Sequence, residues 1–210
     1  LIELGPGNGT LLLDILRITK NFPDFHRSMN VHLIEINSKL IEIQRKKLVD
    51  NNFNHIKKSW NKDLDNIEIG PSIIISNEFF DCFPIKQFQN KNNHWYEKFI
   101  NYNDKEDVFF YEMEKVKNSL FLKELKDLVD IEFVEYSFER DEYFSKLCNF
   151  LSQSKGLCIT SDYGYLELPN HSTLQCIHNH KYSNLFDNIG NQDITSEVNF
   201  EKLIKIAKIN

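Results

Sequence analysis

The chain has 210 residues, 41% of them hydrophobic and 27% charged, a balance typical of one globular domain with a sizeable core. Its formal net charge of −6 at pH 7 disfavours a nucleic-acid partner, because phosphate-backbone binding calls for a basic patch. No apolar run approaches the ~20 residues that a membrane-spanning helix needs, so we expect no membrane span.

The first third of the chain alternates short apolar runs with amphipathic stretches, which is typical of βα units and a parallel sheet. The predicted elements are strands at residues 1–4, 31–36, 55–57 and 72–76, and helices over 10–19 and 38–49. The run Ile73-Ile-Ile75, with turn signals on both sides, indicates a fully buried strand. Since the chain starts inside a strand pattern and stops in a helical one, we expect a piece cut at both ends from a longer protein.

The middle of the chain follows another pattern. Residues 85–111 alternate polar and aromatic side chains around two Asn-rich turns, which predicts β-hairpins. Further predicted elements are helices over 119–129 and 140–152, extended stretches at 132–136, 156–162 and 173–177, and a helix over 199–208. The sequence thus predicts an α/β fold, a doubly wound and mostly parallel sheet with a hairpin and helix region inserted between its fourth and fifth strands. We divide the chain into a first part of the α/β core (1–84), an inserted substrate region (85–155) and a return to the core (156–210).

A glycine-rich turn, Gly5-Pro-Gly-Asn-Gly9, lies between the first strand and the first helix, where open α/β sheets meet nucleotide-type ligands. Glycines take positive φ and let a ligand approach the backbone, and the following helix offers free N–H groups. The G-x-G-x-G spacing differs from the dinucleotide and Walker patterns, so it disfavours nicotinamide chemistry and phosphoryl transfer. Taken alone, the turn also fits a plain strand–helix connection.

Acidic residues stand around this turn. Glu35 ends the second strand, where a carboxylate can accept hydrogen bonds from two ribose hydroxyls. Glu3 can bond the N–H groups of the turn or reach a ligand, and Asp63 can reach an adenine amino group. The alternatives are an ordinary exposed glutamate for Glu35 and a surface turn residue for Asp63.

Polar residues also follow the buried fourth strand. Asn77 and Glu78 leave its carboxyl end and therefore face the ligand crevice. A carboxylate in that place can grip an arginine guanidinium with two hydrogen bonds. Phe79 and Phe80 can exclude water there, although either can equally be a core aromatic.

These motifs resemble the MidA-like family, the mitochondrial complex I assembly protein-arginine methyltransferases and their bacterial relatives. The matching segments are Glu3–Thr10, Leu33–Glu35, Ser76–Pro84, Gln87-Phe88, Trp95–Glu97, Asp162–Gly164, Thr173–Gln175 and Gly190–Thr195 followed by Phe200. The resemblance implies a class I methyltransferase fold, S-adenosylmethionine as the cofactor, and a protein substrate that bears an arginine. For the mitochondrial members, it implies that this substrate is a complex I subunit. It implies a location in the cytoplasm if the protein is bacterial and in the mitochondrial matrix if it is eukaryotic.

The motifs and the resemblance together give the expected site residues. The expected cofactor-binding residues are Glu3, Gly5, Gly7, Gly9, Thr10, Glu35, Asp63 and Asn77. The expected catalytic residues are Asn77, Glu78 and Asp81. No metal is expected, because the four cysteines are scattered and none has the spacing of a zinc ligand; they are expected to be free thiols.

The chain departs from the family pattern at four positions. Asn8 replaces a usual Arg, Phe138 a usual Pro, and Glu197 and Asn199 a usual His and Asp. The last two changes leave open a second class of protein, an assembly factor that keeps the fold without turnover. The divergent insert leaves open a third hypothesis, a methyltransferase for another acceptor.

Overall fold

The computed structural model of the protein describes residues 1–117, 119–126, 128 and 131–210. They pack into two compact units. The first unit contains Leu1–Phe79, Tyr143–Asp162 and Ile206–Asn210, and the second contains Phe80–Glu142 and Tyr163–Lys205. This packing puts residues 143–154 with the first unit and residues 163–205 with the hairpins, so the units do not follow the divisions expected at 84 and 155. The role of 85–155 as a substrate region stays a prediction.

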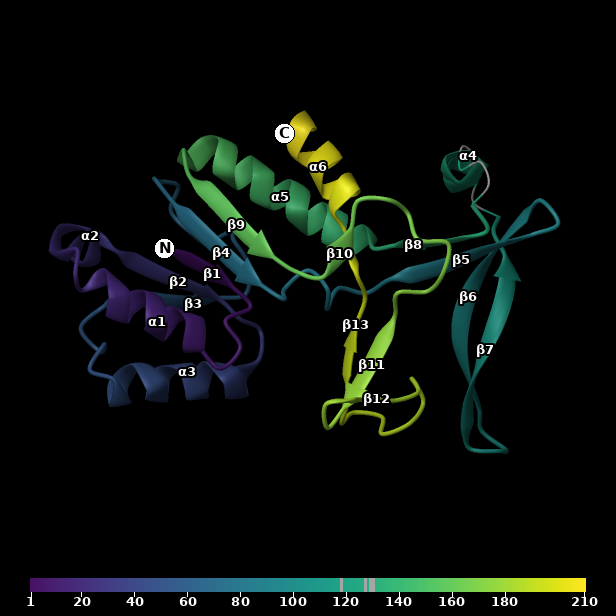
Figure 1. Ribbon diagram of the computed structural model, residues 1–210, viewed down its shortest axis with the longest axis horizontal. Helices are drawn as coiled ribbons and strands as arrows, with labels where there is room; N and C mark the ends of the chain where they lie inside the picture. Colours follow the sequence, from purple (N-terminus) through teal and green to yellow (C-terminus); the bar gives the residue numbers. More distant parts are fainter. Residues whose placement is uncertain (118, 127, 129–130) are drawn as a thin grey trace. The chain divides into compact units, whose positions relative to one another are not determined.

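The first unit is built on a five-stranded parallel sheet in the order β3-β2-β1-β4-β9 (Figure 1). Its strands are β1 (Ile2–Leu4), β2 (Asn30–Ile34), β3 (Lys57–Asn61), β4 (Ile73–Asn77) and β9 (Leu157–Ser161). The chain runs from β1 outward to β3 and then returns to place β4 and β9 on the other side of β1. Such a reversal opens a ligand crevice at the carboxyl ends of the strands. This arrangement confirms the predicted α/β fold class.

Helices cover both faces of this sheet. Figure 1 shows α1 (Thr10–Thr19) and α3 (Ser38–Asp50) on one face and α5 (Phe138–Ser154) on the other. Leu12 and Leu16 of α1 and Leu48 of α3 pack with Val31 and Leu33 of β2 in one buried cluster. These are the periodic apolar positions of the two helices, which explains why the sequence predicts both of them well.

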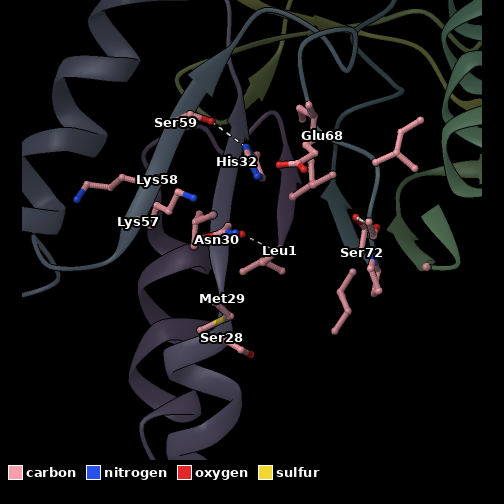
Figure 2. A pocket seen from close by; sticks show the side chains of 18 of the residues that line it. Leu1, Ser28, Met29, Asn30, His32, Lys57, Lys58, Ser59, Glu68 and Ser72 are labelled. Carbon is pink, nitrogen blue, oxygen red and sulfur yellow. Dashed lines mark hydrogen bonds between the residues drawn. The ribbon is translucent and has the colours of Figure 1, made fainter. Parts of the chain in front are cut away.

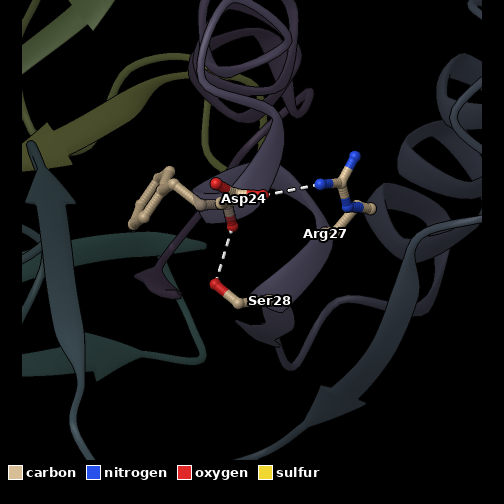
Figure 3. A network of polar contacts seen from close by, with 4 residues as sticks. Asp24, Arg27 and Ser28 are labelled. Atoms are coloured by element: carbon tan, nitrogen blue, oxygen red, sulfur yellow. Dashed lines mark hydrogen bonds and ion pairs between the residues drawn. The ribbon is translucent and has the colours of Figure 1, made fainter.

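A short helix, α2 (Pro23–Ser28), was not predicted. Pro23 stands at its first turn, where the missing N–H costs no hydrogen bond. Arg27 Nη2 pairs with Asp24 Oδ1 at 2.6 Å, and Ser28 Oγ donates to the carbonyl oxygen of Phe25 at 2.8 Å (Figure 3). Six residues are too few to show a helical apolar period, so the pattern gave no signal.

The second unit holds a four-stranded antiparallel sheet in the order β7-β6-β5-β8. Its strands are β5 (Lys86–Lys91), β6 (His94–Asn103), β7 (Val108–Lys115) and β8 (Phe133–Tyr136), and helix α4 spans Ser119–Lys126. Phe88, Trp95, Leu125 and Val134 form its buried cluster. The turn between β5 and β6 has positive φ at Asn92 (52°) and Asn93 (60°), which confirms the first predicted hairpin turn. The second turn was expected at 101–104 and forms at 104–107, because Asn101 and Asn103 are paired with β7 inside β6.

The remaining strands of this unit are short. Its further elements are β10 (Gly164–Tyr165), β11 (Gln175–His178), β12 (Lys181–Tyr182), β13 (Asp193–Thr195) and β14 (Val198–Asn199). Helix α6 (Phe200–Ile209) begins in this unit, and its residues from Ile206 onward belong to the first unit. Strand β11 lies between β12 and β13, and β10 pairs with β14. The segments between β4 and β9 contain β5 to β8, α4 and α5, which confirms the predicted insertion.

One predicted strand is misplaced. The third strand was expected at 55–57 and forms at Lys57–Asn61, in parallel register with Asn30–Ile34. Its sequence, KKSWN, is mostly polar because the strand lies at the edge of the sheet, so pairing with β2 rather than an apolar pattern determines its position. The helix expected over 119–129 ends at Lys126, and residues 127 and 129 lie outside the described residues. No described helix is long and apolar enough to cross a membrane.

Candidate active site

The glycine turn connects β1 to α1 at the carboxyl edge of the first unit's sheet. Gly5, Gly7 and Gly9 all have positive φ, at 60°, 51° and 73°. The amide of Gly5 donates to the carbonyl oxygen of Ile34 at 3.0 Å, and that of Gly9 to the carbonyl oxygen of Pro6 at 2.7 Å. The turn is therefore closed on itself and tied to the end of β2, in a backbone conformation that favours glycine.

The three glycines differ in what surrounds them. A Cβ atom at Gly5 would lie 2.7 Å from Cδ2 of Phe79, and one at Gly9 would lie 3.2 Å from Cγ of Gln44. A Cβ at Gly7 would meet nothing within 4 Å. A side chain at Gly5 would therefore clash with Phe79 and one at Gly9 would press on Gln44, whereas Gly7 faces open space, which fits a turn whose backbone is approached by a ligand.

Glu35 follows β2 directly and is buried, with 8% of its surface exposed. Its Oε1 accepts a hydrogen bond from the amide of Asn37 at 2.9 Å, and its Oε2 accepts one from Nε2 of Gln44 at 3.3 Å. The alternative of an ordinary exposed glutamate is therefore wrong. Because a carboxylate has about four lone-pair positions, Glu35 keeps capacity for two more donors, as a pair of ribose hydroxyls requires.

Gln44 is a further candidate residue at this site, and the sequence did not predict it. It lies in α3 with 1% of its surface exposed, and its Nε2 also donates to the carbonyl oxygen of Gly7 at 2.7 Å. The indole Nε1 of Trp60 in β3 donates to its Oε1 at 2.7 Å. The sequence signal that could have identified Gln44 is its position one helical turn before Leu48, on the otherwise apolar face of α3.

Glu3 lies in the middle of β1, beside Leu33 and Ile75 of the neighbouring strands. Only 3% of its surface is exposed, and its Oε2 has no hydrogen-bond partner among the described residues. Burial raises the pKa of Glu3 to about 7. A buried carboxyl group with an unused oxygen, two residues before the glycine turn, fits a place that receives a donor or a cation from a ligand.

Thr10 and Asp63, which are also expected to bind the cofactor, have protein partners. Thr10 is exposed, and its Oγ1 accepts a hydrogen bond from Nζ of Lys47 at 3.1 Å. Asp63 is half-buried, and its Oδ1 accepts from the amide of Asp65 at 2.9 Å, which closes a local turn. The contact of Asp63 with an adenine amino group stays a prediction.

Asn77 and Glu78 form the exit from β4, and both are exposed. Glu78 has a positive φ of 49°, and its amide donates to the carbonyl oxygen of Ser161 at 2.9 Å. The next amide, of Phe79, donates to Oδ2 of Asp162 at 3.1 Å. The ends of β4 and β9 therefore hold an exposed glutamate in a backbone conformation that residues other than glycine rarely adopt. Such backbone strain is concentrated at functional sites.

Asp81 belongs to the second unit. It is buried, and its carbonyl oxygen accepts a hydrogen bond from the amide of Ser196 at 2.9 Å. Phe80 is fully buried and stacks on Phe83 with ring centroids 5.9 Å apart, which agrees with its reading as a core aromatic. The catalytic role of Asp81 stays a prediction.

The departures near the end of the chain have structural partners in the second unit. The amide of Glu197 donates to Oγ1 of Thr173 at 3.1 Å, and its carbonyl oxygen accepts from Nη1 of Arg140 at 3.1 Å. Asn199 accepts a hydrogen bond on Oδ1 from the amide of Lys202 at 2.9 Å, as a helix cap does at the start of α6. The loop is thus held by backbone groups and a cap that do not require the family's usual His and Asp.

A cavity of about 740 Å³ lies at the opposite edge of the parallel sheet (Figure 2). It is lined by the beginnings of the strands, at Asn30, Lys57 and Ser72, and it contains the His32 ring bonded to Oγ of Ser59 at 2.8 Å. None of the predicted site residues lines it. Because doubly wound sheets bind ligands at the carboxyl ends of their strands, we place the candidate site at the glycine turn instead. Within the described ranges, no three His, Cys, Asp or Glu side chains form a group that could hold a metal ion.

Comparisons with known proteins address the family and the fold. The family model described as "Putative S-adenosyl-L-methionine-dependent methyltransferase" matches residues 1–210. The protein arginine methyltransferase NDUFAF7 of Xenopus tropicalis is 30% identical over 235 residues, and the NDUFAF7 homolog of Caenorhabditis elegans 29% over 228; both are named mitochondrial, and each match covers 99% of this chain. A Burkholderia thailandensis structure with bound S-adenosyl-homocysteine is similar with a TM-score of 0.82, at 19% identity over 99% of this chain and 54% of that one.

These matches bear on the fold and the cofactor. The structural likeness confirms the class I methyltransferase fold, and the family match confirms S-adenosylmethionine as the predicted cofactor. The chain spans about half the length of the curated relatives it matches, 53% of each of the two named above.

Proposed function

Since this chain belongs to the family of S-adenosyl-L-methionine-dependent methyltransferases, we propose that it transfers methyl groups to an arginine side chain of a protein. The observation that supports an arginine acceptor is Glu78, an exposed carboxylate held at positive φ at the exit from β4. Relatives named protein arginine methyltransferases support the same acceptor. A complex I subunit as the substrate, and the mitochondrial matrix or bacterial cytoplasm as the location, stay predictions.

The residues of the first unit fit the cofactor. The open space at Gly7 admits a ligand against the turn, Glu35 retains acceptor capacity for the ribose hydroxyls, and the unused oxygen of Glu3 suits a ligand ammonium group. When bound, S-adenosylmethionine supplies a methyl group on a positively charged sulfur. The protein contributes mainly alignment, because methyl transfer is an in-line displacement that depends on the geometry of donor and acceptor.

Glu78 acts on the acceptor in this proposal. Its two carboxylate oxygens accept parallel N–H bonds from a guanidinium group, which fixes the plane of the acceptor. The nitrogen that gains the methyl group gives up one proton, and the Glu78 carboxylate is the base that receives it. The hydrogen bonds from the amides of Glu78 and Phe79 keep this carboxylate at the edge of the sheet.

The test is incubation of the protein with a methyl-labelled donor and candidate partner proteins, followed by mass spectrometry. We expect label on arginine side chains, and we expect Glu78→Gln to bind S-adenosyl-homocysteine as the wild type does while losing transfer. Label on a small metabolite alone would overturn the arginine acceptor. Normal donor binding with no transfer to any acceptor would instead support the assembly factor without turnover.

A further inference from the structure

Gln44 connects three segments of the candidate site that are far apart in the sequence. Its Nε2 donates to the carbonyl oxygen of Gly7 at 2.7 Å and to Oε2 of Glu35 at 3.3 Å, and its Oε1 accepts from Nε1 of Trp60 at 2.7 Å. A primary amide nitrogen has two N–H groups, so both are used. With 1% of its surface exposed, the side chain has little access to solvent that could compete for these bonds.

Trp60 determines which way the amide of Gln44 points. An indole N–H only donates, so it must face an oxygen, and this fixes Oε1 of Gln44 toward β3. The nitrogen is thereby fixed toward Gly7 and Glu35, which offer only acceptors. A reversed amide would place two donors together and set an oxygen against the Glu35 carboxylate. The guanidinium of Arg45, 4.7 Å from the centre of the Trp60 ring, packs over the same indole.

We propose that Gln44, oriented by Trp60, is a positioning residue that holds the Glu35 carboxylate and the Gly7 carbonyl in the geometry that recognises a ribose. This inference rests on the proposed function, because it assumes that Glu35 receives ribose hydroxyls. The bond from Gln44 occupies one lone pair of Oε2, and the bond from Asn37 occupies one of Oε1. The lone pairs that remain are then directed away from both partners, toward the ligand.

The measurement that tests this role is discrimination between two ligands rather than affinity alone. Calorimetry would give the Kd of S-adenosyl-homocysteine and of its 2′-deoxy analogue for the wild type and for Gln44→Met, whose side chain has the same length and no polar hydrogens. The wild type is expected to bind the deoxy analogue about tenfold more weakly, as the loss of a hydrogen bond to a charged group implies. Gln44→Met is expected to weaken the binding of S-adenosyl-homocysteine by about tenfold and the binding of the deoxy analogue less. The ratio of the two Kd values, deoxy analogue over S-adenosyl-homocysteine, should then approach one.

Gln87→Met is the matched control. Gln87 is also a buried glutamine that donates to a glutamate, Oε1 of Glu135, at 2.7 Å, but it lies in the second unit. It is expected to leave the ratio of the two affinities at the wild-type value. Trp60→Phe is expected to give a ratio of the two Kd values between those of the wild type and Gln44→Met. The double variant is expected to have the same ratio as Gln44→Met, because the two residues act through one hydrogen bond.

Each result bears on one claim. Equal weakening of both ligands by Gln44→Met would overturn the positioning role and leave the proposed function standing. Failure of the folded wild type to bind S-adenosyl-homocysteine would overturn the proposed function itself. If Gln44→Met does not fold, Trp60→Phe alone decides, since an unchanged ratio in that variant contradicts the proposed orientation of the amide.

Discussion

Replacing Glu3 by Gln tests whether burial raises the pKa of this carboxyl group, which lies two residues before the glycine turn and has an oxygen without a hydrogen-bond partner among the described residues. Burial raises the pKa of Glu3 from about 4.5 to about 7, so between these pH values the unfolded chain has lost a proton that the folded protein retains. Folding stability therefore falls as pH rises through this window and levels off above pH 7. At about 1.4 kcal/mol for each tenfold change in proton concentration, the full loss is about 3 kcal/mol. The amide in Glu3→Gln does not titrate, so the variant escapes this loss.

The assay is urea unfolding of wild type and Glu3→Gln at pH 5 and pH 8, followed by tryptophan fluorescence. The free energy of unfolding of the variant relative to the wild type should increase by about 2–3 kcal/mol between the two pH values, because other titrating groups cancel in the comparison. Added S-adenosyl-homocysteine should reduce this increase if its ammonium group stabilises the Glu3 carboxylate. A stability difference that is the same at both pH values would show that the pKa of Glu3 is not raised in the folded protein.

Three further changes separate binding from folding. Gly7→Ala should lower the free energy of unfolding by about 1 kcal/mol because of its positive φ, and it should abolish binding of S-adenosyl-homocysteine. Gly5→Ala should lower the free energy of unfolding several times more, because its Cβ would clash with Phe79. Urea unfolding measures the stability and calorimetry the binding, and binding that survives Gly7→Ala would place the ligand elsewhere. Glu78→Gly should raise the free energy of unfolding by up to about 1 kcal/mol, because glycine adopts the positive φ without strain, and it should abolish methyl transfer. A destabilised variant would show that the Glu78 side chain stabilises the fold. Asn199→Ala should lower the free energy of unfolding by about 1 kcal/mol and Asn199→Asp should not, since only the former removes the cap of α6; equal effects would contradict the capping role.

Local patterns were enough to predict the elements that bury an apolar face. Helices α1 and α3 and strand β4 appear where the periodicity placed them, and the turn at Asn92 and Asn93 forms as expected because turn residues act locally. The pattern failed at β3, whose polar sequence is extended only because β2 offers it a partner. It failed at α2 because a helix of six residues is shorter than the signal.

The candidate site divides in the same way. The glycine turn, the acidic residue after β2 and the polar exit from β4 can each be predicted from the sequence, because each is a short run whose residue types indicate its chemistry. Three features appear only in the folded chain: Glu35 is buried and already accepts two hydrogen bonds, Glu3 keeps an oxygen without a partner among the described residues, and Gln44 joins the turn to Glu35. Burial and hydrogen-bond partners arise when β1, β2 and α3 pack together, so no single segment contains that information.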